Sequence, residues 1–571
     1  MTSLAHWVAW ASVVALAAIL LGEGWEISTG EAFQTAVLAV GFAAVALSVW
    51  YDLRLVWQRS RRLRELKSVV VDMALLVPII AFVGRPSLWG LSVFLRQSLI
   101  LSRLIARTER YRSFVGALQA DPAKVMVLSF AGIIFLGGVL LTFPRATTDG
   151  HGAGIVDAMF TSTSATCVTG LATLNTIADQ LADLSRQSFS PFGQVVILML
   201  AQIGGLGIMT ISAATVVIAG GRLGLRRTGL MQSLLDEEST ATLRAAVRQI
   251  LVMTFTVEAI GAVMLFVRFD SADIDTGTAL WRAVFTSISA FCNAGFSVFG
   301  DSLTTFVGDT WVNGVVAGLI IVGGLGFATV VTLTARRTWR AGPVGAWRRL
   351  PLHSRLVVVT TLALIGFGTV SWFFFEYDHS LAGLSVHDKV VASFFQSVSL
   401  RTAGFNTVDV GTISRVTLIF SCILMFIGAS PGSTGGGVKT TTFAVLLMSI
   451  RASIRSQANI EVGRRSISHA VVNRAVSIVV IALLVAVLGL VLLLITQPDL
   501  PFDQLLFEVV SALGTVGLSM GATPHLDDVG KFIIIVVMFI GRVGPLTIAL
   551  AVGSRQTAGR IRYPEGRVIV G

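Results

Sequence analysis

Apolar runs long enough to cross a membrane recur along the whole chain. The hydrocarbon core of a bilayer, about 30 Å thick, needs roughly 20 apolar residues in a helix. Such runs begin near residues 6, 31, 69, 91, 124, 191, 246, 310, 355, 412, 470 and 529. Between the later runs lie shorter stretches that mix apolar and small polar residues. The pattern predicts about twelve membrane-spanning helices and about four helices too short to cross.

Each shorter stretch ends in one of four related sequences. They read TSTSATCVTGL, TSISAFCNAGFS, QSVSLRTAGFNT and VVSALGTVGLSM, with shared glycines at Gly170, Gly295, Gly404 and Gly517. The intervals between these glycines are 125, 109 and 113 residues. A second echo follows each one: IGGLGIMT from Ile203, VGGLGFAT from Val322, IGASPGSTGGGVKTTT from Ile427 and IGRVGPLT from Ile540. Two echoes in the same order, four times over, indicate an internal fourfold repeat.

Each repeat is predicted to contain a span, a short re-entrant helix, a glycine stretch and a second span. Asp157 opens the first short helix as a candidate N-cap, and Asp388 and Asp503 hold the corresponding places. The sequence therefore predicts an all-α polytopic membrane protein. Its parts are an N-terminal four-helix membrane bundle at residues 1–122, repeats at residues 123–220, 245–338, 354–452 and 469–555, and a cytoplasmic tail at residues 556–571.

Composition and charge support a membrane protein. The 571 residues are 54% hydrophobic and only 13% charged, against about 25% charged in soluble domains. The net charge of +11 does not indicate nucleic acid, because the arginines gather in alternate loops and the loops between them are acidic or neutral. This is the positive-inside pattern. It predicts a multi-pass plasma-membrane protein with both termini in the cytoplasm, glycine stretches facing outward, and basic loops near anionic membrane lipid.

The chain shows no pattern typical of disulfides, export or enzyme catalysis. Cys167 and Cys292 lie in glycine stretches and Cys422 in an apolar run, so we expect buried free thiols. The first apolar run lacks a basic leader and an Ala-x-Ala site, which favours a retained span over a signal peptide. The seven histidines are scattered, and no His/Asp/Glu cluster recurs in the spans. An enzyme is therefore not expected.

The glycine stretches can bind a cation through their backbone. Non-helical backbone at membrane depth is tolerated only where protein or water covers it, so four re-entrant helices must face one another around an aqueous path. A single stretch would favour a small-residue helix contact, but four in register favour a ring of carbonyls that replaces the hydration shell of a monovalent cation. The predicted filter residues are Val168, Thr169, Gly170, Asn293, Ala294, Gly295, Thr402, Ala403, Gly404, Thr515, Val516 and Gly517.

The second span of repeat three is interrupted. Pro431 and five glycines from Gly428 to Gly437 cannot maintain a continuous helix. This predicts a flexible intramembrane loop beneath the filter, with a simple kink as the alternative. Val438 separates Gly437 from Lys439, so the segment lacks the spacing of a phosphate-binding loop. No nucleotide or other organic cofactor is expected in this chain.

Arg542 lies in the last span, where the other repeats have glycine or alanine. A charge at this depth is costly unless it faces the aqueous path. There it would repel a passing cation by roughly 1 to 4 kcal/mol at about 4 Å. A structural salt bridge or a clamp on carbonyl groups is the alternative. The predicted gate residues are Ser433, Gly435, Gly436, Gly437, Lys439 and Arg542.

On these motifs the chain resembles the Trk/Ktr/HKT superfamily of potassium transporters over residues 123–555. The motifs are the four filters, SPGSTGGGVKTTT from Ser430 and GRVGPLT from Gly541. The resemblance implies four membrane-pore-membrane repeats in a pseudo-fourfold arrangement, K⁺ as the transported ion held by filter carbonyls, and the glycine-rich loop as a gate. In that family a serine at the first filter position is associated with sodium passage, so four glycines imply potassium selectivity. The resemblance also implies a homodimer with a cytosolic nucleotide-binding regulatory subunit of the TrkA/KtrA type.

Residues 1–122 lie outside that resemblance. Their spans carry Asp72, Arg96, Arg103 and Arg107, which resembles a voltage-sensor module. The arginines lack regular three-residue spacing, which favours a structural bundle. For the whole chain the second hypothesis is a cation-coupled secondary transporter of another solute, with a midplane site. It predicts inverted repeats, whereas the four repeats here are direct. Coupling to protons or sodium is left open.

Overall fold

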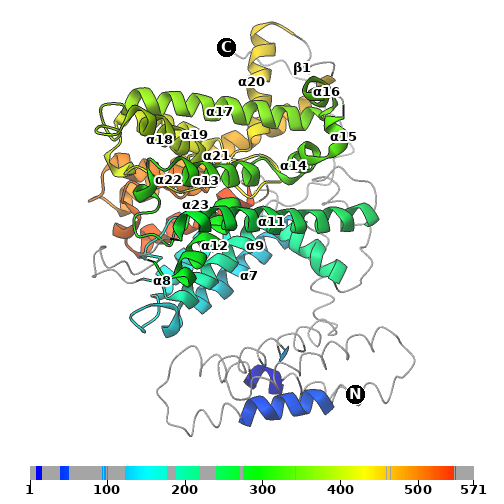
Figure 1. Ribbon diagram of the computed structural model, residues 1–571, viewed down its shortest axis with the longest axis vertical. Coiled ribbons are helices and arrows are strands. Elements are labelled where there is room, and N and C mark those ends of the chain that lie inside the picture. Colours follow the sequence, from blue (N-terminus) through cyan, green and yellow to red (C-terminus); the bar gives the residue numbers. More distant parts are fainter. Residues whose placement is uncertain are drawn as a thin grey trace, which may run out of the picture.

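The chain is almost entirely helical where its structure is described (Figure 1). The computed structural model describes residues 8, 10–15, 39–50, 93, 96–97, 100, 122–176, 188–218, 240–270, 274–340, 342–457, 460–462, 465–544 and 547. Within these residues the β-structure is limited to one short antiparallel hairpin and three isolated bridges. The expected all-α class is confirmed for this part of the chain.

Four consecutive units share one order of helices: a long first helix, a short second helix and a third helix that is bent or broken. The first unit has α7 (Pro122–Leu141), α8 (Ile155–Thr166) and α9 (Pro191–Ile218). The second has α11 (Thr240–Phe269), α12 (Thr276–Cys292), α13 (Thr310–Gly324) and α14 (Phe327–Thr334). The third has α17 (Leu352–Glu376), α18 (Val386–Ser399), α19 (Arg415–Phe426) and α20 (Thr440–Ile454). The fourth has α21 (His469–Thr496), α22 (Phe502–Gly514) and α23 (Asp528–Val543).

Among the described residues, short elements connect the later units: α15 (Arg336–Trp339) and α16 (Gly342–Arg349), then the hairpin of β1 (Ile460–Val462) and β2 (Arg465–Ile467). Each unit also contains a 3₁₀ turn between its helices, namely η1 (Pro144–Ala146), η2 (Thr304–Phe306), η3 (Val410–Thr412) and η4 (Thr523–His525). The sequence pattern did not predict the hairpin. It packs its apolar side chains against α20 and α21.

Among the described residues, three helices are long and apolar enough to cross a membrane alone: Val247–Phe269, Leu352–Glu376 and His469–Thr496. The last is α21, in which only 17% of the most apolar stretch is buried inside the protein. Such a helix, apolar and yet uncovered by protein, is typical of a segment that faces lipid. A helix begins within six residues of each predicted run from residue 124 onward.

The second spans correct one expectation from the sequence. A break was expected only in repeat three, but each of the four second spans is bent, broken or ended, with a glycine of left-handed backbone at the break or within a few residues after it. These glycines are Gly207 (φ 73°), Gly326 (φ 84°), Gly432 (φ 69°) and Gly544 (φ 93°). At Gly326 the axes of α13 and α14 differ by 109°. The conserved second echo therefore marks a break shared by all four units, because glycine adopts this conformation readily and ends a helix.

The start of α8 corrects a second expectation. The helix begins at Ile155 with Gly154 as its N-cap, so Asp157 lies inside the first turn and does not cap the helix. Its carboxylate instead pairs with Lys531 on α23, with Oδ1 and Nζ 2.8 Å apart. Asp388 likewise lies in the first turn of α18, which is capped by Ser385. Acidic residues in a first turn still interact favourably with the helix dipole.

Small residues let each short helix pack closely on the first helix of its own unit. A Cβ on Gly137, Gly261 or Gly368 would come within about 2.5 Å of a serine Oγ on the short helix, namely Ser162, Ser287 and Ser397. Those hydroxyls donate to backbone carbonyls of the long helices at 2.6 to 2.7 Å. In the fourth unit Gly489 meets Val509 and Val537 instead. Close approach through small residues is how helices associate where lipid removes the hydrophobic drive.

The N-terminal segment is described only in pieces. Arg96 is fully buried and donates to Ser48 Oγ on the helix Ala39–Trp50. Ser12 Oγ donates to Gln97 Oε1 at 2.8 Å. Asp72, Arg103 and Arg107, and most of the predicted N-terminal bundle, lie outside the described residues, as does the tail 556–571. The hypotheses about voltage sensing and about the termini stay predictions.

Candidate functional site

The short helices pack around a closed circuit. Each contacts the third helix of the unit before it: α12 contacts α9, α18 contacts α13, α22 contacts α19, and α8 contacts α23 of the last unit. The first and fourth units are thereby joined, although they lie at opposite ends of the sequence (Figure 1). The C-terminal ends of α8, α12, α18 and α22 consequently meet at one place.

Four glycines form a ring at this meeting point. We call Gly170, Gly295, Gly404 and Gly517 the glycine ring. A Cβ on each would lie against the carbonyl oxygen that precedes the next glycine: 2.6 Å from Ala294, 2.9 Å from Ala403, 2.5 Å from Val516 and 2.0 Å from Thr169, respectively. The order closes on itself after four steps. A side chain at any of these positions would have to displace backbone of the neighbouring unit.

The backbone approaching the ring has the same unusual shape in each unit. Two residues before each glycine, a non-glycine residue has left-handed φ: Val168 (56°), Asn293 (58°), Thr402 (70°) and Thr515 (51°). The ring glycines themselves have φ between 72° and 97°. Left-handed backbone is costly for residues that carry a Cβ. Its recurrence at the same position in all four units indicates that the surrounding structure imposes this backbone shape.

The amide groups of these segments are used by the short helices, which leaves the carbonyls available. The amides of Thr169, Ala294 and Val516 donate to the carbonyls of Ser164, Ser289 and Ser511 at 2.7 to 2.9 Å. In the third unit the segment is one residue shorter, and Ala403 N donates to Ser399 O at 3.0 Å. Four helix C-termini directed to one point also place partial negative charge there. The site is therefore rich in acceptors and suited to a cation.

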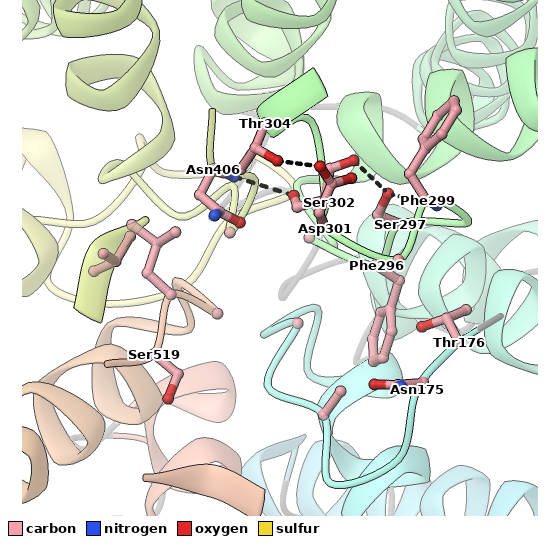
Figure 2. Close-up of a pocket in the computed structure, with 18 of the residues that line it drawn as sticks. Asn175, Thr176, Phe296, Ser297, Phe299, Asp301, Ser302, Thr304, Asn406 and Ser519 are labelled. Carbon is pink, nitrogen blue, oxygen red and sulfur yellow. Dashed lines mark hydrogen bonds between the residues drawn. The ribbon is translucent and has the colours of Figure 1, made fainter. Parts of the chain in front are cut away.

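A pocket of about 530 Å³ opens on one side of the glycine ring, and we call it the vestibule. Figure 2 shows loops from all four units around it, and its lining includes Asn175, Thr176, Ser297, Asn406 and Ser519. Asp301 and Asp409 are two exposed carboxylates in its lining. The loops are tied together, since Asn406 N donates to Ser302 Oγ at 3.2 Å and Leu303 N to Asn406 O at 3.0 Å. The vestibule gives the ring an aqueous approach.

The opposite side of the ring is covered by residues 428–439, which we call the glycine loop. Its Thr434 Oγ1 donates to Asn293 Oδ1 at 3.1 Å and Phe291 O at 3.2 Å. A Cβ on Gly435 or Gly436 would lie 2.1 or 2.4 Å from a threonine Oγ1 of the left-handed residues, Thr402 and Thr515. The loop therefore lies directly against the left-handed residues Asn293, Thr402 and Thr515 of three units. Only glycine fits at its point of closest approach.

Backbone hydrogen bonds fasten the glycine loop to the second unit. Thr434 N donates to Gly323 O at 3.2 Å and Ser430 N to Gly324 O at 3.0 Å. Phe327 N donates back to Gly432 O at 3.1 Å. The break after α13 exposes these carbonyls, because helix ends leave their last carbonyls without helical partners. The shared break thus supplies acceptors that an unbroken span would not.

Two cationic side chains lie at the glycine loop. Lys439 Nζ donates to Gly435 O at 2.7 Å and Gly436 O at 3.3 Å. Arg542 donates through Nη1 to Thr434 O and through Nη2 to Gly204 O. Both cations thus bind carbonyls of the loop or its neighbours. Of the other predicted gate residues, Gly437 has left-handed φ (68°), and the buried Ser433 hydroxyl has no partner among the described residues.

Several polar residues near the path were not singled out from the sequence. Arg401, at the end of α18, points its two terminal nitrogens at Thr361 O and Gly428 O, each at 3.5 Å. Glu508 on α22 is fully buried and accepts from Ser519 Oγ at 2.7 Å and from Thr523 Oγ1. Glu258 on α11 is buried against Gln202. Each is an ionisable residue in an otherwise apolar or small-residue run, and that signal alone could have found them.

The cysteines agree with the expectation of free thiols, and the expected burial holds for two of the three. All three are free thiols, with Cys167 and Cys292 buried and Cys422 partly exposed. Among the described residues there is no group of three or more His, Cys, Asp or Glu that could hold a metal ion.

The fold and site together define a class: a helical, multi-pass membrane transport protein. The chain belongs to the TrkH family, whose model, described as "Cation transport protein", matches residues 119–557. This confirms the family expected from the sequence motifs.

Similar proteins agree with this assignment. The chain is 39% identical to "Ktr system potassium uptake protein B" of Bacillus subtilis (strain 168), over 80% of this chain and 98% of that protein. It is 35% identical to "Potassium/sodium uptake protein NtpJ" of Enterococcus hirae, over 79% and 98%. The solved potassium transporter TrkH from Vibrio parahaemolyticus has the same fold, with a TM-score of 0.61 at 17% identity, covering 85% of this chain and 96% of that one.

Proposed function

We propose that this chain is the pore-forming subunit of a potassium uptake system, and that K⁺ passes through the glycine ring. The observation that carries the proposal is the closed circuit of four glycines, each against the carbonyl before the next. Carbonyl oxygens so placed can replace the hydration shell of a monovalent cation without any charged side chain. The names of similar proteins support potassium as the ion.

We assign the four units to a pseudo-fourfold repeat about the ion path. The cyclic packing of short helices on neighbouring units supports this arrangement. The basic loops favour an orientation with both termini in the cytoplasm and the vestibule outside. Potassium would then enter from the vestibule, cross the glycine ring and meet the glycine loop.

The glycine loop and Arg542 are assigned to the gate of this path. The loop lies against the filter segments, and the guanidinium joins it to α9. A cation passing about 4 Å from Arg542 would be repelled by roughly 1 to 4 kcal/mol, depending on the effective dielectric constant. Opening requires that both be displaced. We assign that step to a cytosolic nucleotide-binding subunit of the TrkA/KtrA type acting on a homodimer of this chain, on the basis of the family resemblance.

The test is cation flux into liposomes that contain only the purified chain. Potassium, rubidium and sodium are compared under an imposed voltage. Passive flux of potassium and rubidium that exceeds sodium flux by at least about tenfold, or roughly 1.4 kcal/mol, is expected once the gate opens. Equal sodium flux would refute the assignment of the glycine ring as a potassium filter. If flux is absent, addition of the regulatory subunit is expected to start it.

A further inference from the structure

Glu258 is a buried carboxyl group that the proposed ion path does not use. It lies on α11 and is only 4% exposed. Its Oε2 accepts a hydrogen bond from Gln202 Nε2 at 3.2 Å. Gln202 lies on α9, so the bond joins the second unit to the first. Side chains of this kind are costly at membrane depth unless they are paired, and the pairing here is between two units.

Cys292, the last residue of α12, completes the cluster. Its Sγ donates to Gln202 Oε1 at 3.3 Å and lies 3.8 Å from Glu258 Oε1. A Cβ on Gly205 would come within 2.8 Å of this sulfur, so α9 lies directly against the end of α12. Both ends of the Gln202 amide are therefore held. Because Gln202 lies in the last turn of α9 before the break at Gly207, these two contacts also fix the position of that turn.

Gly204 lies in that turn, and its carbonyl accepts a hydrogen bond from Arg542 Nη2. The break at Gly207 leaves carbonyls of the preceding turn without helical donors, so this oxygen is open to an outside donor. Through Nη1 the same guanidinium donates to Thr434 O of the glycine loop. Arg542 is thus a bridge between α9 and the loop. The bridge depends on where the last turn of α9 is held.

We propose that Gln202 and Glu258 are positioning residues for the gate: their hydrogen bond holds the last turn of α9 so that the Gly204 carbonyl meets Arg542. The pair thereby sets how firmly the glycine loop closes the path. This inference rests on the proposed function, in which the loop and Arg542 form the barrier. The pair affects how readily the gate opens and does not affect which ion is selected, which we assign to the glycine ring.

The test measures basal rubidium flux from liposomes containing the full chain. Gln202→Leu removes the amide at nearly constant size, and we expect flux to rise roughly three- to tenfold, as for the loss of one ordinary hydrogen bond. The ratio of rubidium to sodium flux should not change. Glu258→Gln keeps an acceptor for the Gln202 amide and should stay within about twofold of the wild type. If Glu258→Gln raises basal rubidium flux as much as Gln202→Leu does, the positioning role does not belong to this hydrogen bond.

A double-mutant cycle with Arg542→Ala separates the possible failures. If the pair acts through Arg542, Gln202→Leu should add less than about twofold to the flux of Arg542→Ala. The same fold-rise in both backgrounds would show that the pair acts elsewhere. If Arg542→Ala alone leaves flux unchanged, the proposed barrier is wrong; if Arg542→Ala raises flux but Gln202→Leu does not, only the positioning role is wrong. If the ratio of rubidium flux to sodium flux falls in Gln202→Leu, the pair would be assigned to the proposed filter instead.

Discussion

The two sides of the glycine ring differ in how evenly the four units contribute. At the ring, every unit supplies a glycine with left-handed φ and a left-handed residue two positions earlier. On the other side only the third unit has the glycine loop, and only the fourth has an arginine, where the others have Gly205, Gly324 and Ala429. A carbonyl ring needs all its members, whereas a barrier needs only one. The proposed selection site is therefore symmetric, and the proposed barrier is asymmetric.

Substitution of a glycine in the glycine ring should give the largest effect, seen in the ratio of potassium flux to sodium flux. In Gly517→Ser a Cβ would lie 2.0 Å from Thr169 O, at a residue with φ of 94°. We expect the ratio of potassium to sodium flux to fall at least about tenfold, or roughly 1.4 kcal/mol. Gly295→Ser, where the nearest oxygen is 2.9 Å from the Cβ, should have the same sign and a smaller size. The measurement is flux in liposomes with each ion in turn.

The matched control for these variants is Gly318→Ser on α13. A Cβ at Gly318 meets nothing within 4 Å, so the flux ratio should equal that of the wild type. If Gly517→Ser and Gly295→Ser keep the wild-type ratio as well, the glycine ring does not select the ion.

Removing the asymmetric side should change the rate and leave selection intact. Deletion of residues 435–437 withdraws the part of the glycine loop that lies against Thr402 and Thr515. We expect basal rubidium flux to rise at least about fivefold, or roughly 1 kcal/mol, with the rubidium-to-sodium ratio within about twofold of the wild type. Flux at or below the wild-type level in monodisperse protein would count against the loop as a barrier.

The symmetric side could largely be read from the sequence, and the asymmetric side only in part. A fourfold echo locates Gly170 and its counterparts because each unit must repeat the same backbone shape. The breaks at Gly207, Gly326 and Gly544 were not predicted, although the repeated echo contains these glycines, because glycines in an apolar run are also compatible with a continuous helix that packs closely. The hydrogen bond between Gln202 and Glu258 joins residues 56 positions apart on different units. No local pattern encodes such a contact, since it depends on how the units pack.

A smaller effect is expected within the symmetric side, at one position that carries three different residue types across the four units. Counting nine residues back from the ring glycine, and one fewer in the shorter third unit, gives Thr161, Thr286, Gln396 and Glu508, all fully buried. Glu508 binds Ser519 and Thr523 on the loop that leaves the ring. Glu508→Leu should destabilise the protein by about 1 to 3 kcal/mol, because the buried Thr523 hydroxyl and the half-buried Ser519 hydroxyl lose their acceptor. Thermal denaturation in detergent measures this.

Thr286→Val is the matched control for Glu508→Leu. The Thr286 hydroxyl is buried and has no hydrogen-bond partner in the part of the chain that the structure describes, so its removal should lower the thermal midpoint by much less than Glu508→Leu does. Equal losses in the two variants would mean that packing at this position, and not the hydrogen bonds of Glu508, stabilises the loop.

The smallest effect is expected at the rim of the vestibule. Asp301 and Asp409 are exposed there and belong to the second and third units, so their field is not symmetric. Neutralising both as Asp301→Asn and Asp409→Asn should lower potassium influx about twofold at low ionic strength, because fixed charges concentrate cations at a pore entrance. The difference should vanish near 1 M salt, where the Debye length is about 3 Å. Asp499→Asn, an exposed carboxylate outside the vestibule lining, is the control. If the deficit in potassium influx persists at high salt, the two carboxylates would belong among the residues that bind the ion. The vestibule side of the path would then depend on particular side chains, as is proposed for Arg542 on the other side.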